Sequence, residues 1–424
     1  MTIVVIAFLL LLVLGIPIAF VILGPSLLYL ALNPLMSSIV AQRMASSLES
    51  FPLLAVPFFV VAGAFMGVGG IAKRLYDLAD ALVGHWYGGL AQVGVLNSLF
   101  IGAMSGSANA DAAIDARTIV PIMRLQGYSN GFASVIAAAS GSISPIMPPS
   151  IGLIIYGLLT GTSIGRLFIG GIIPAFIMTA ALLLMVRLIS WRRGYLPSRP
   201  ARLPLRETAA RARDALWALV MPVLLIVGLR GGWFTPTELG AIAAIYAFIV
   251  GLFIYRGVLW DEVIGIMRES ACTTANVLFI VATASLLSMI LALEQAPQQM
   301  MSALLSVSDN KYVVLIIINL FLLILGTVLE SLAVMIILVP ILLNVIQNLG
   351  VDPVHFGVVL VLNTTIGAIT PPVGTVLYTT CSITGCSIEE FAVEFIPFFL
   401  ALVCVLFLLT LVPPLVTFLP NLLF

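Results

Sequence analysis

The stretch ITPPVGTVLY, Ile369 to Tyr378, places two adjacent prolines and a glycine inside an otherwise apolar run that extends over about 354–384. Proline removes a backbone hydrogen-bond donor and clashes with the preceding helical turn, so a helix should break here. In hydrocarbon, freed backbone groups have no water to bind, and a break is tolerated only where protein or a wet cavity covers it. The stretch therefore predicts a broken membrane helix.

The composition of the whole chain agrees with a membrane protein. Of its 424 residues, 62% are hydrophobic and only 8% are charged, and the mean hydropathy is +1.22. A soluble domain carries about a quarter charged residues, so we predict an all-α polytopic membrane protein. The first apolar run, 2–32, has neither a preceding basic residue nor a small-residue cleavage signal, and we interpret it as a retained membrane helix.

The apolar runs predict nine membrane spans and two re-entrant hairpins. The expected spans are 2–32, 52–70, 130–160, 167–190, 214–230, 237–256, 271–293, 354–384 and 391–420. Two further apolar regions, 88–123 and 312–347, have small or polar residues at their centres. That pattern is typical of two half-helices that meet at a tip.

The positions of the charges predict how the chain is oriented. Eight of the 18 Lys and Arg residues lie between Arg187 and Arg213, so this loop should be cytoplasmic. Nine crossings then place the N-terminus in the cytoplasm and the C-terminus outside, in the periplasm. The first hairpin should open to the cytoplasm and the second to the outside. The net charge of zero predicts no nucleic-acid partner.

Short blocks of sequence recur at a nearly constant shift of about 220 residues. Val120-Pro121-Ile122 recurs as Val339-Pro340-Ile341, and Gly152 with Tyr156 recurs as Gly374 with Tyr378. Because an odd number of crossings separates the copies, they should be inverted relative to each other, as in many secondary transporters. The predicted division is a first repeat at 1–190, a basic loop at 191–213, a linking helix at 214–236 and a second repeat at 237–424.

A segment between the second span and the first hairpin is amphipathic. Ile71, Leu75, Leu78, Leu82 and Trp86 recur at helical spacing, with charged residues on the other positions. Such a helix can lie in the membrane surface, or it can brace a partner or another part of the chain. The sequence leaves both interpretations open.

Four stretches combine helix-breaking residues with side-chain oxygens, and they pair across the repeat. They are GAMSGSANAD (102–111), SGSISPIMPPSIG (140–152), GTVLES (326–331) and NTTIGAITPPVGT (363–375). Free carbonyls and neutral oxygens suit a hard cation such as Na⁺, and the half-helix N-termini after each break attract an anion. A kink or a close-packing surface is the alternative for each stretch alone. The pairing favours two cation sites that flank an anionic substrate.

The intramembrane carboxylates are further candidates. Asp111 and Asp115 are spaced i, i+4 beside Arg117 and form either a structural ion-pair cluster or a transport element. Glu330, at the second tip, is the stronger candidate for transport. Since the chain has neither an HExxH motif nor a Walker A motif, we predict that it is no enzyme and that an ion gradient or a partner supplies the energy.

The motifs at 102–123, 139–157 and 363–385 resemble those of the large membrane subunit of tripartite ATP-independent periplasmic (TRAP) transporters, and the resemblance covers essentially the whole chain. It implies an elevator-type transporter in a bacterial or archaeal inner membrane. It also implies a small four-helix membrane subunit and a periplasmic substrate-binding protein as partners. The expected activity is Na⁺-coupled uptake of an organic acid, such as a C4-dicarboxylate, sialic acid or another sugar acid. The alternative is a stand-alone Na⁺-coupled symporter or antiporter of the same superfamily.

The resemblance also implies site residues, with Na⁺ as the coupling ion and no other cofactor. The expected Na⁺-binding residues are Ser105, Gly106, Ser107, Asn109, Ser144, Pro145, Pro148, Pro149, Thr327, Glu330, Ser331, Thr370, Pro371, Pro372 and Gly374. The expected substrate-binding residues are Ser107, Asp111, Ser150, Gly152, Thr364 and Thr375.

Overall fold

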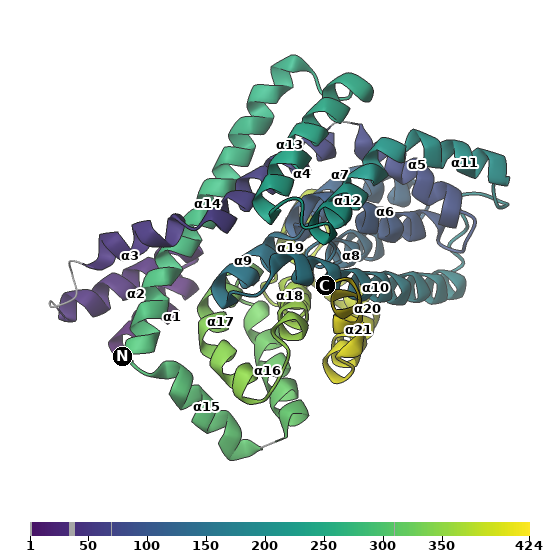
Figure 1. Ribbon diagram of the computed structural model, residues 1–424. Helices are drawn as coiled ribbons and strands as arrows, with labels where there is room; N and C mark the ends of the chain where they lie inside the picture. The colour runs from purple at the N-terminus through teal and green to yellow at the C-terminus, as the bar shows by residue number, and fades with distance from the viewer. Residues whose placement is uncertain (1, 34–38, 69, 309) are drawn as a thin grey trace.

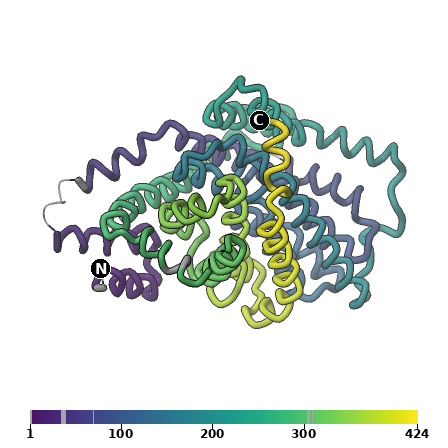
Figure 2. Tube along the Cα trace, turned by 60° about the horizontal axis from the view of Figure 1, so that its bottom comes forward, coloured from purple at the N-terminus to yellow at the C-terminus, as the bar shows by residue number. Residues whose placement is uncertain are grey.

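The computed structural model describes residues 2–33, 39–68, 70–308 and 310–424, and this part of the chain contains helices and no strand. Figures 1 and 2 show helices of both halves of the chain gathered around a shared centre, with the N-terminus at one side. The first half contains α1 (Thr2–Val13), α2 (Ile18–Leu32), α3 (Ile39–Leu48), η2 (Phe51–Leu54), α4 (Ala55–Val68), α5 (Ile71–Val83), α6 (Gly89–Ser105), α7 (Ala108–Leu125), α8 (Asn130–Gly141), α9 (Ile151–Thr160) and α10 (Ile164–Arg193).

The remaining helices include a second series in the same order. They are α11 (Leu205–Asp214), α12 (Leu216–Arg230), α13 (Pro236–Ile249), η3 (Val250–Ile254), α14 (Trp260–Leu293), α15 (Ala296–Val307), α16 (Lys311–Gly326), α17 (Ser331–Asn348), α18 (Pro353–Ala368), α19 (Thr375–Thr384), α20 (Ile388–Leu411) and α21 (Pro414–Leu423). From α6 to α10, each helix begins 222 to 224 residues before its counterpart from α16 to α20. This order agrees with the sequence repeat, and the inverted orientation of the halves stays a prediction.

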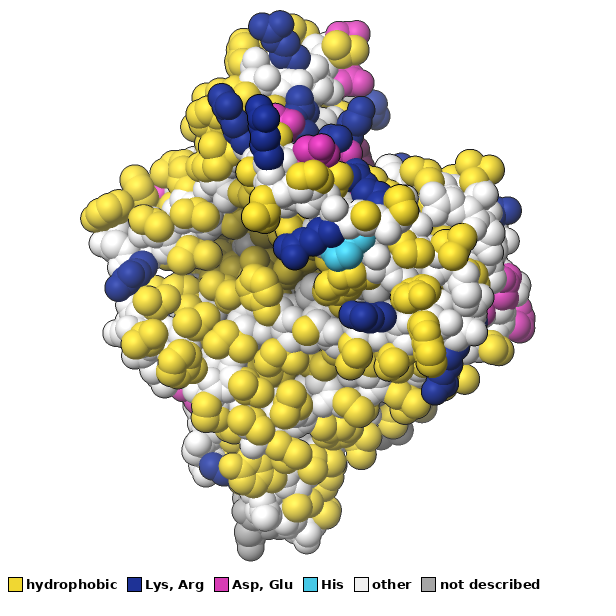
Figure 3. Space-filling model, turned by 90° about the vertical axis from the view of Figure 1, so that its right-hand side faces the viewer, with side chains coloured by type: hydrophobic (Ala, Val, Ile, Leu, Met, Phe, Trp, Pro, Cys, Tyr) yellow, Lys and Arg dark blue, Asp and Glu magenta, His cyan; other side chains and the backbone are white. Residues whose placement is uncertain are grey.

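Six helices of the described chain are long and apolar enough to cross a membrane. Five of them coincide with expected spans, and the sixth is α17, the second arm of the expected hairpin at 312–347. Figure 3 shows a broad band of hydrophobic side chains across one face, with basic and acidic side chains gathered mainly above it. That distribution fits a protein whose middle faces lipid.

The first expected span was wrong as a single helix, because 2–32 forms α1 and α2, which pack against each other. Between them, Gly15 has a φ of 70° and Pro17 follows, and both end a regular helix. The expected span at 391–420 is also divided, because Val412 and Pro413 separate α20 from α21, which begins at Pro414. The expected span at 214–230 is preceded by α11, which meets α12 at an angle of 66°.

The amphipathic segment forms α5, and most of its apolar face is covered by protein, although Leu82 at its end is 40% exposed. Ile71 and Leu75 are fully buried, and α5 packs against α6 and α11. Of the two interpretations of this segment, the structure therefore supports a helix that braces another part of the same chain.

The helix breaks expected at both hairpin tips and within both broken helices are present, and the re-entrant course of the hairpins stays a prediction. Gly106 and Ser107 separate α6 from α7, and residues 327–330 separate α16 from α17. The broken helices are interrupted at 142–150 and 369–374. Within each half the hairpin packs on its own broken helix, and across the halves α7 packs on α19 while α17 packs on α9. The crossed packing brings all four interruptions to one place.

Candidate ion and substrate site

The first hairpin tip lies directly against the first broken helix. Gly106 has a φ of 60°, and a Cβ atom there would lie 2.5 Å from the carbonyl oxygen of Pro149. A Cβ atom on Gly102 would lie 2.8 Å from the Cα of Ser144. Only glycine permits these approaches, so the small residues of this motif bring the two backbones together.

Asp111 joins the same two elements from within. Its side chain is fully buried and accepts hydrogen bonds from the hydroxyls of Ser105, at 2.5 Å, and of Ser144. One turn further along α7, Asp115 accepts from Ser98 Oγ at 2.8 Å and from Ser140 Oγ at 3.3 Å. The carboxylates therefore hold the first hairpin to its neighbours through serine hydroxyls.

The interpretation of these aspartates as an ion-pair cluster with Arg117 is wrong. No ion pair joins either carboxylate to a basic side chain in the described part of the chain, and Arg117 is exposed. Helical geometry explains the error, since residues two or six positions apart do not share the face on which Asp111 and Asp115 lie.

The second tip contacts its own broken helix in the same way. The amide of Gly374 donates to the carbonyl of Thr327 at 3.0 Å, and Ser331 Oγ donates to the carbonyl of Thr364 at 3.0 Å. A Cβ atom on Gly367 would lie 2.6 Å from the Cα of Gly326, so α16 and α18 are in backbone contact. Each half thus has a tip fixed to a break by glycines and hydroxyls.

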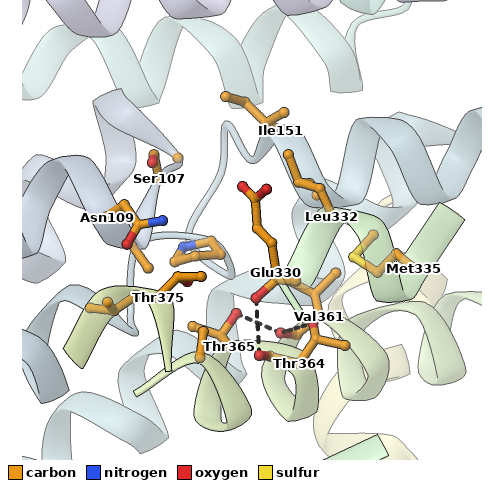
Figure 4. A pocket seen from close by; sticks show the side chains of 17 residues that line it. Ser107, Asn109, Ile151, Glu330, Leu332, Met335, Val361, Thr364, Thr365 and Thr375 are labelled. Carbon is orange, nitrogen blue, oxygen red and sulfur yellow. Dashed lines mark hydrogen bonds between the residues drawn. The ribbon is translucent and has the colours of Figure 1, made fainter. Parts of the chain in front are cut away.

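A cavity lies where the two tips and the two breaks meet (Figure 4), and its volume is about 80 Å³. Nine of the predicted site residues line it: Gly106, Ser107, Asn109, Pro145, Gly152, Glu330, Ser331, Thr364 and Thr375. Residues from 106–152 and from 330–376 contribute together, although more than 170 positions separate the two groups. The structure thus joins the two sets of residues that the sequence assigned to separate repeats.

Four helix N-termini converge on this cavity. Its lining includes Ser107 to Asn109 at the start of α7, Ile151 and Gly152 of α9, Ser331 and Leu332 of α17, and Thr375 and Val376 of α19. The first backbone N–H groups of a helix have no intrahelical partner, and the helix dipole is positive there. The cavity is therefore suited to an anion.

The cavity also presents oxygen atoms without partners. Asn109 Oδ1 and Thr375 Oγ1 are buried and accept or donate no hydrogen bond among the described residues. The Glu330 side chain extends toward the cavity between Ile151 and Leu332 (Figure 4). An unsatisfied buried polar atom costs about 1–3 kcal/mol, which a bound cation or water would recover. These oxygens fit a hard cation such as Na⁺.

The other predicted site residues do not line the cavity. Ser150 Oγ donates to the carbonyl of Pro145 and accepts from the amide of Leu153, so it caps α9. Thr327 and Thr370 donate to carbonyls of the preceding helical turn at 2.7 and 2.6 Å. The remaining members of this group are Ser105, Asp111, Ser144, Pro148, Pro149, Pro371, Pro372 and Gly374. Their roles as ligands stay predictions.

Sequence reasoning missed the apolar part of the lining. Met335, Val361, Thr365 and Ala368 face the cavity from α17 and α18. Thr365 lies in the motif Asn363-Thr364-Thr365, from which it could have been predicted as a lining residue. Met335 and Val361 are residue types that are common throughout membrane helices, so the sequence does not distinguish them.

The crossed hairpins, the broken helices and the cavity between them define the class: an all-helical membrane transporter. The crystal structure of the YdaH transporter of Alcanivorax borkumensis has the same fold, with a TM-score of 0.59 at 16% identity over 96% of this chain and 98% of that one.

The sequence comparisons then define the family. The model of the tripartite ATP-independent periplasmic transporter, DctM component, matches residues 5–415, and the chain belongs to this family of TRAP large permeases. It is 39% identical to the sialic acid TRAP transporter large permease SiaM of Vibrio cholerae, over 96% of this chain and 95% of the relative. It is 38% identical to the C4-dicarboxylate large permease DctM of Pseudomonas aeruginosa, over 90% and 89%. The family resemblance inferred from the motifs is confirmed.

Proposed function

We propose that this large permease takes up an organic acid across the inner membrane and that Na⁺ entering with the substrate drives the uptake. The single observation that carries the proposal is the cavity at which four helix N-termini and the unpaired oxygens of Asn109 and Thr375 meet. Helix N-termini favour the negative substrate, and the oxygens favour the cation.

Each hairpin tip with its own break would hold one Na⁺. In the first half, the backbone of 105–109 and the loop 144–149 supply the oxygens, with Asn109 facing the cavity. In the second half, Thr327, Glu330 and the loop 370–374 do so, together with Thr375, which the sequence assigned to the substrate and whose unpaired oxygen faces the cavity. A cation at each tip would add positive charge beside the bound acid, which couples the binding of the two.

The substrate class rests on the relatives. The two relatives named above are described as permeases for sialic acid and for C4-dicarboxylates, and both substrates carry carboxylates. A cavity of about 80 Å³ is smaller than the roughly 300 Å³ that an organic ligand of moderate size needs. We infer that the two hairpins separate to admit the acid, consistent with an elevator-type motion of the hairpins and broken helices.

The test is uptake into proteoliposomes that contain the chain, a small membrane subunit and a candidate substrate-binding protein. We expect accumulation of a labelled acid only with an inward Na⁺ gradient and with the binding protein present. Uptake that is independent of Na⁺ would contradict the coupling. Full uptake by the chain alone would support the alternative, a stand-alone symporter or antiporter.

A further inference from the structure

A polar cleft lies apart from the transport cavity, between α5, α11, the first turn of α12 and η3. Its volume is about 620 Å³. Four basic side chains line it, namely Lys73, Arg74, Arg211 and Arg213, against two acidic ones, Asp77 and Asp214. The excess of positive charge makes the cleft a candidate site for an anion.

Two of the four basic side chains, Arg74 and Arg211, interact with other residues of the cleft and connect the helices that form it. Arg211 Nη1 lies 3.3 Å from Asp77 Oδ2, which ties α11 to α5. The Arg74 guanidinium lies 3.9 Å from the centre of the Tyr255 ring, and the Tyr255 hydroxyl donates to the carbonyl of Asp214 at 2.8 Å. The cleft is therefore formed before any ligand arrives, which lowers the cost of binding.

Two of the basic groups remain available. Lys73 and Arg213 are exposed and form no ion pair with any acid in the described part of the chain. They extend from opposite walls, α5 and α11, into the same cleft. Together with Arg74, they can surround a group that carries several anionic oxygens.

The other side of the cleft is apolar and exposed. Trp217 is 46% exposed and Ile254 is 40% exposed, and both line the cleft. Next to them, Phe253 and Trp260 are also exposed and are in edge-to-face contact with each other. Tryptophan is enriched where membrane proteins cross the headgroup layer. Figure 3 shows basic side chains at the border of a hydrophobic band on the face that it draws.

We propose that this cleft binds the phosphate of an anionic phospholipid, with Lys73, Arg74 and Arg213 around the phosphate and the first acyl carbons against Trp217 and Ile254. A free phosphate would use the basic wall only, and the exposed apolar wall favours the lipid. Because α11 belongs to the strongly basic loop at 191–213, the lipid would come from the cytoplasmic leaflet, where anionic lipids attract such segments. The bound lipid would fasten α5 to the α11–α12 bend.

Binding of short-chain phosphatidylglycerol and phosphatidylcholine to the full chain in neutral detergent, followed by native mass spectrometry, tests the proposal. The wild type should prefer phosphatidylglycerol. The double variant Lys73→Gln with Arg213→Gln should bind phosphatidylglycerol about 25-fold more weakly, because each basic side chain near the lipid surface contributes about fivefold to the affinity. The matched control is Arg202→Gln with Arg206→Gln, which also removes two positive charges, both from the basic loop at 191–213 and outside the cleft. Equal affinities in the two double variants would overturn the proposal.

Two further measurements separate the lipid from a free anion. Excess inorganic phosphate should leave phosphatidylglycerol bound to the protein. Displacement of the lipid by phosphate would show that the apolar side of the cleft does not contribute to binding, and would contradict the proposal. Phosphatidylglycerol brominated near the headgroup should quench the fluorescence of Trp217, because that ring lines the cleft. The contribution of Trp217 is the part of the tryptophan fluorescence that the Trp217→Phe variant lacks. Absence of this quenching would contradict the site even if the charge variants alter affinity.

Discussion

At the scale of single residues, the site consists of hydroxyls, amides and glycines, with few charged groups. Serine hydroxyls donate hydrogen bonds to both aspartates of α7, although Oδ1 of Asp115 has no partner among the described residues. Asn109 and Thr375 have unpaired oxygens on the cavity. Removal of an unpaired oxygen alters ligand binding without breaking a contact of the fold, so these positions separate binding from stability.

Thr375→Val is the residue-scale test of cation binding. The substitution keeps the shape of the side chain and removes Oγ1, which has no partner among the described residues. We expect the Na⁺ concentration for half-maximal uptake to rise about tenfold, as for the loss of one hydrogen bond or ligand. Thr379→Val on the same helix, whose hydroxyl donates to the carbonyl of Thr375, is the control. An unchanged Na⁺ titration would exclude Thr375 as a ligand.

Gly106→Ala tests the close contact at the first tip. The added methyl group meets the Pro149 carbonyl at 2.5 Å in a backbone conformation that disfavours alanine. We expect a loss of about 1–3 kcal/mol in the free energy of unfolding, visible as a lower Tm. The control is Gly161→Ala, which has a similar φ of 69° but open space around it, so it should cost less.

At the scale of elements, the decisive feature is that each hairpin packs on the broken helices of both halves. The long arms α7 and α17 reach across to α19 and α9, and this packing brings the four helix N-termini together. Backbone contact between α16 and α18 at Gly326 and Gly367 holds the second hairpin in place.

Gly367→Val should separate α16 from α18. Three added carbons cannot fit where a single Cβ already lies 2.6 Å from Gly326 Cα, and overpacking of this kind costs about 1–3 kcal/mol. We expect a lower Tm and a loss of uptake. Gly265→Val, where a Cβ atom meets nothing within 4 Å, should leave both unchanged. Normal uptake by Gly367→Val would show that this helix contact is dispensable.

At the scale of the whole molecule, the placement in the membrane follows from the charges. The basic segment at 191–213 predicts the cytoplasmic side, and the five crossings expected after it then place the C-terminus outside. Alkaline phosphatase fused after Phe424 should be active, because it folds only in the periplasm, whereas a fusion after Arg202 should be inactive. The reverse result would show that the orientation or the number of crossings is wrong.

The sequence by itself determined the class of protein, the family, and the helix breaks at both tips and in both broken helices. Proline, glycine and charge act locally, through backbone geometry and the cost of burying charge in lipid, so their effects can be predicted without contacts. Sequence reasoning did not predict the helix break at Gly15 and Pro17 within the first apolar run, although both residue types are known to end helices.

Only the tertiary structure decided which of the predicted residues share a cavity. Asp111 is an acidic residue in the strongest motif, yet it bonds to Ser105 and Ser144 and does not line the cavity. Met335 and Val361 have no polar group and do line it. The packing of α7 on α19 and of α17 on α9 determines which residues line the cavity. These contacts form between helices that are far apart in the chain. A local sequence pattern does not determine which side of one helix packs against the other helix.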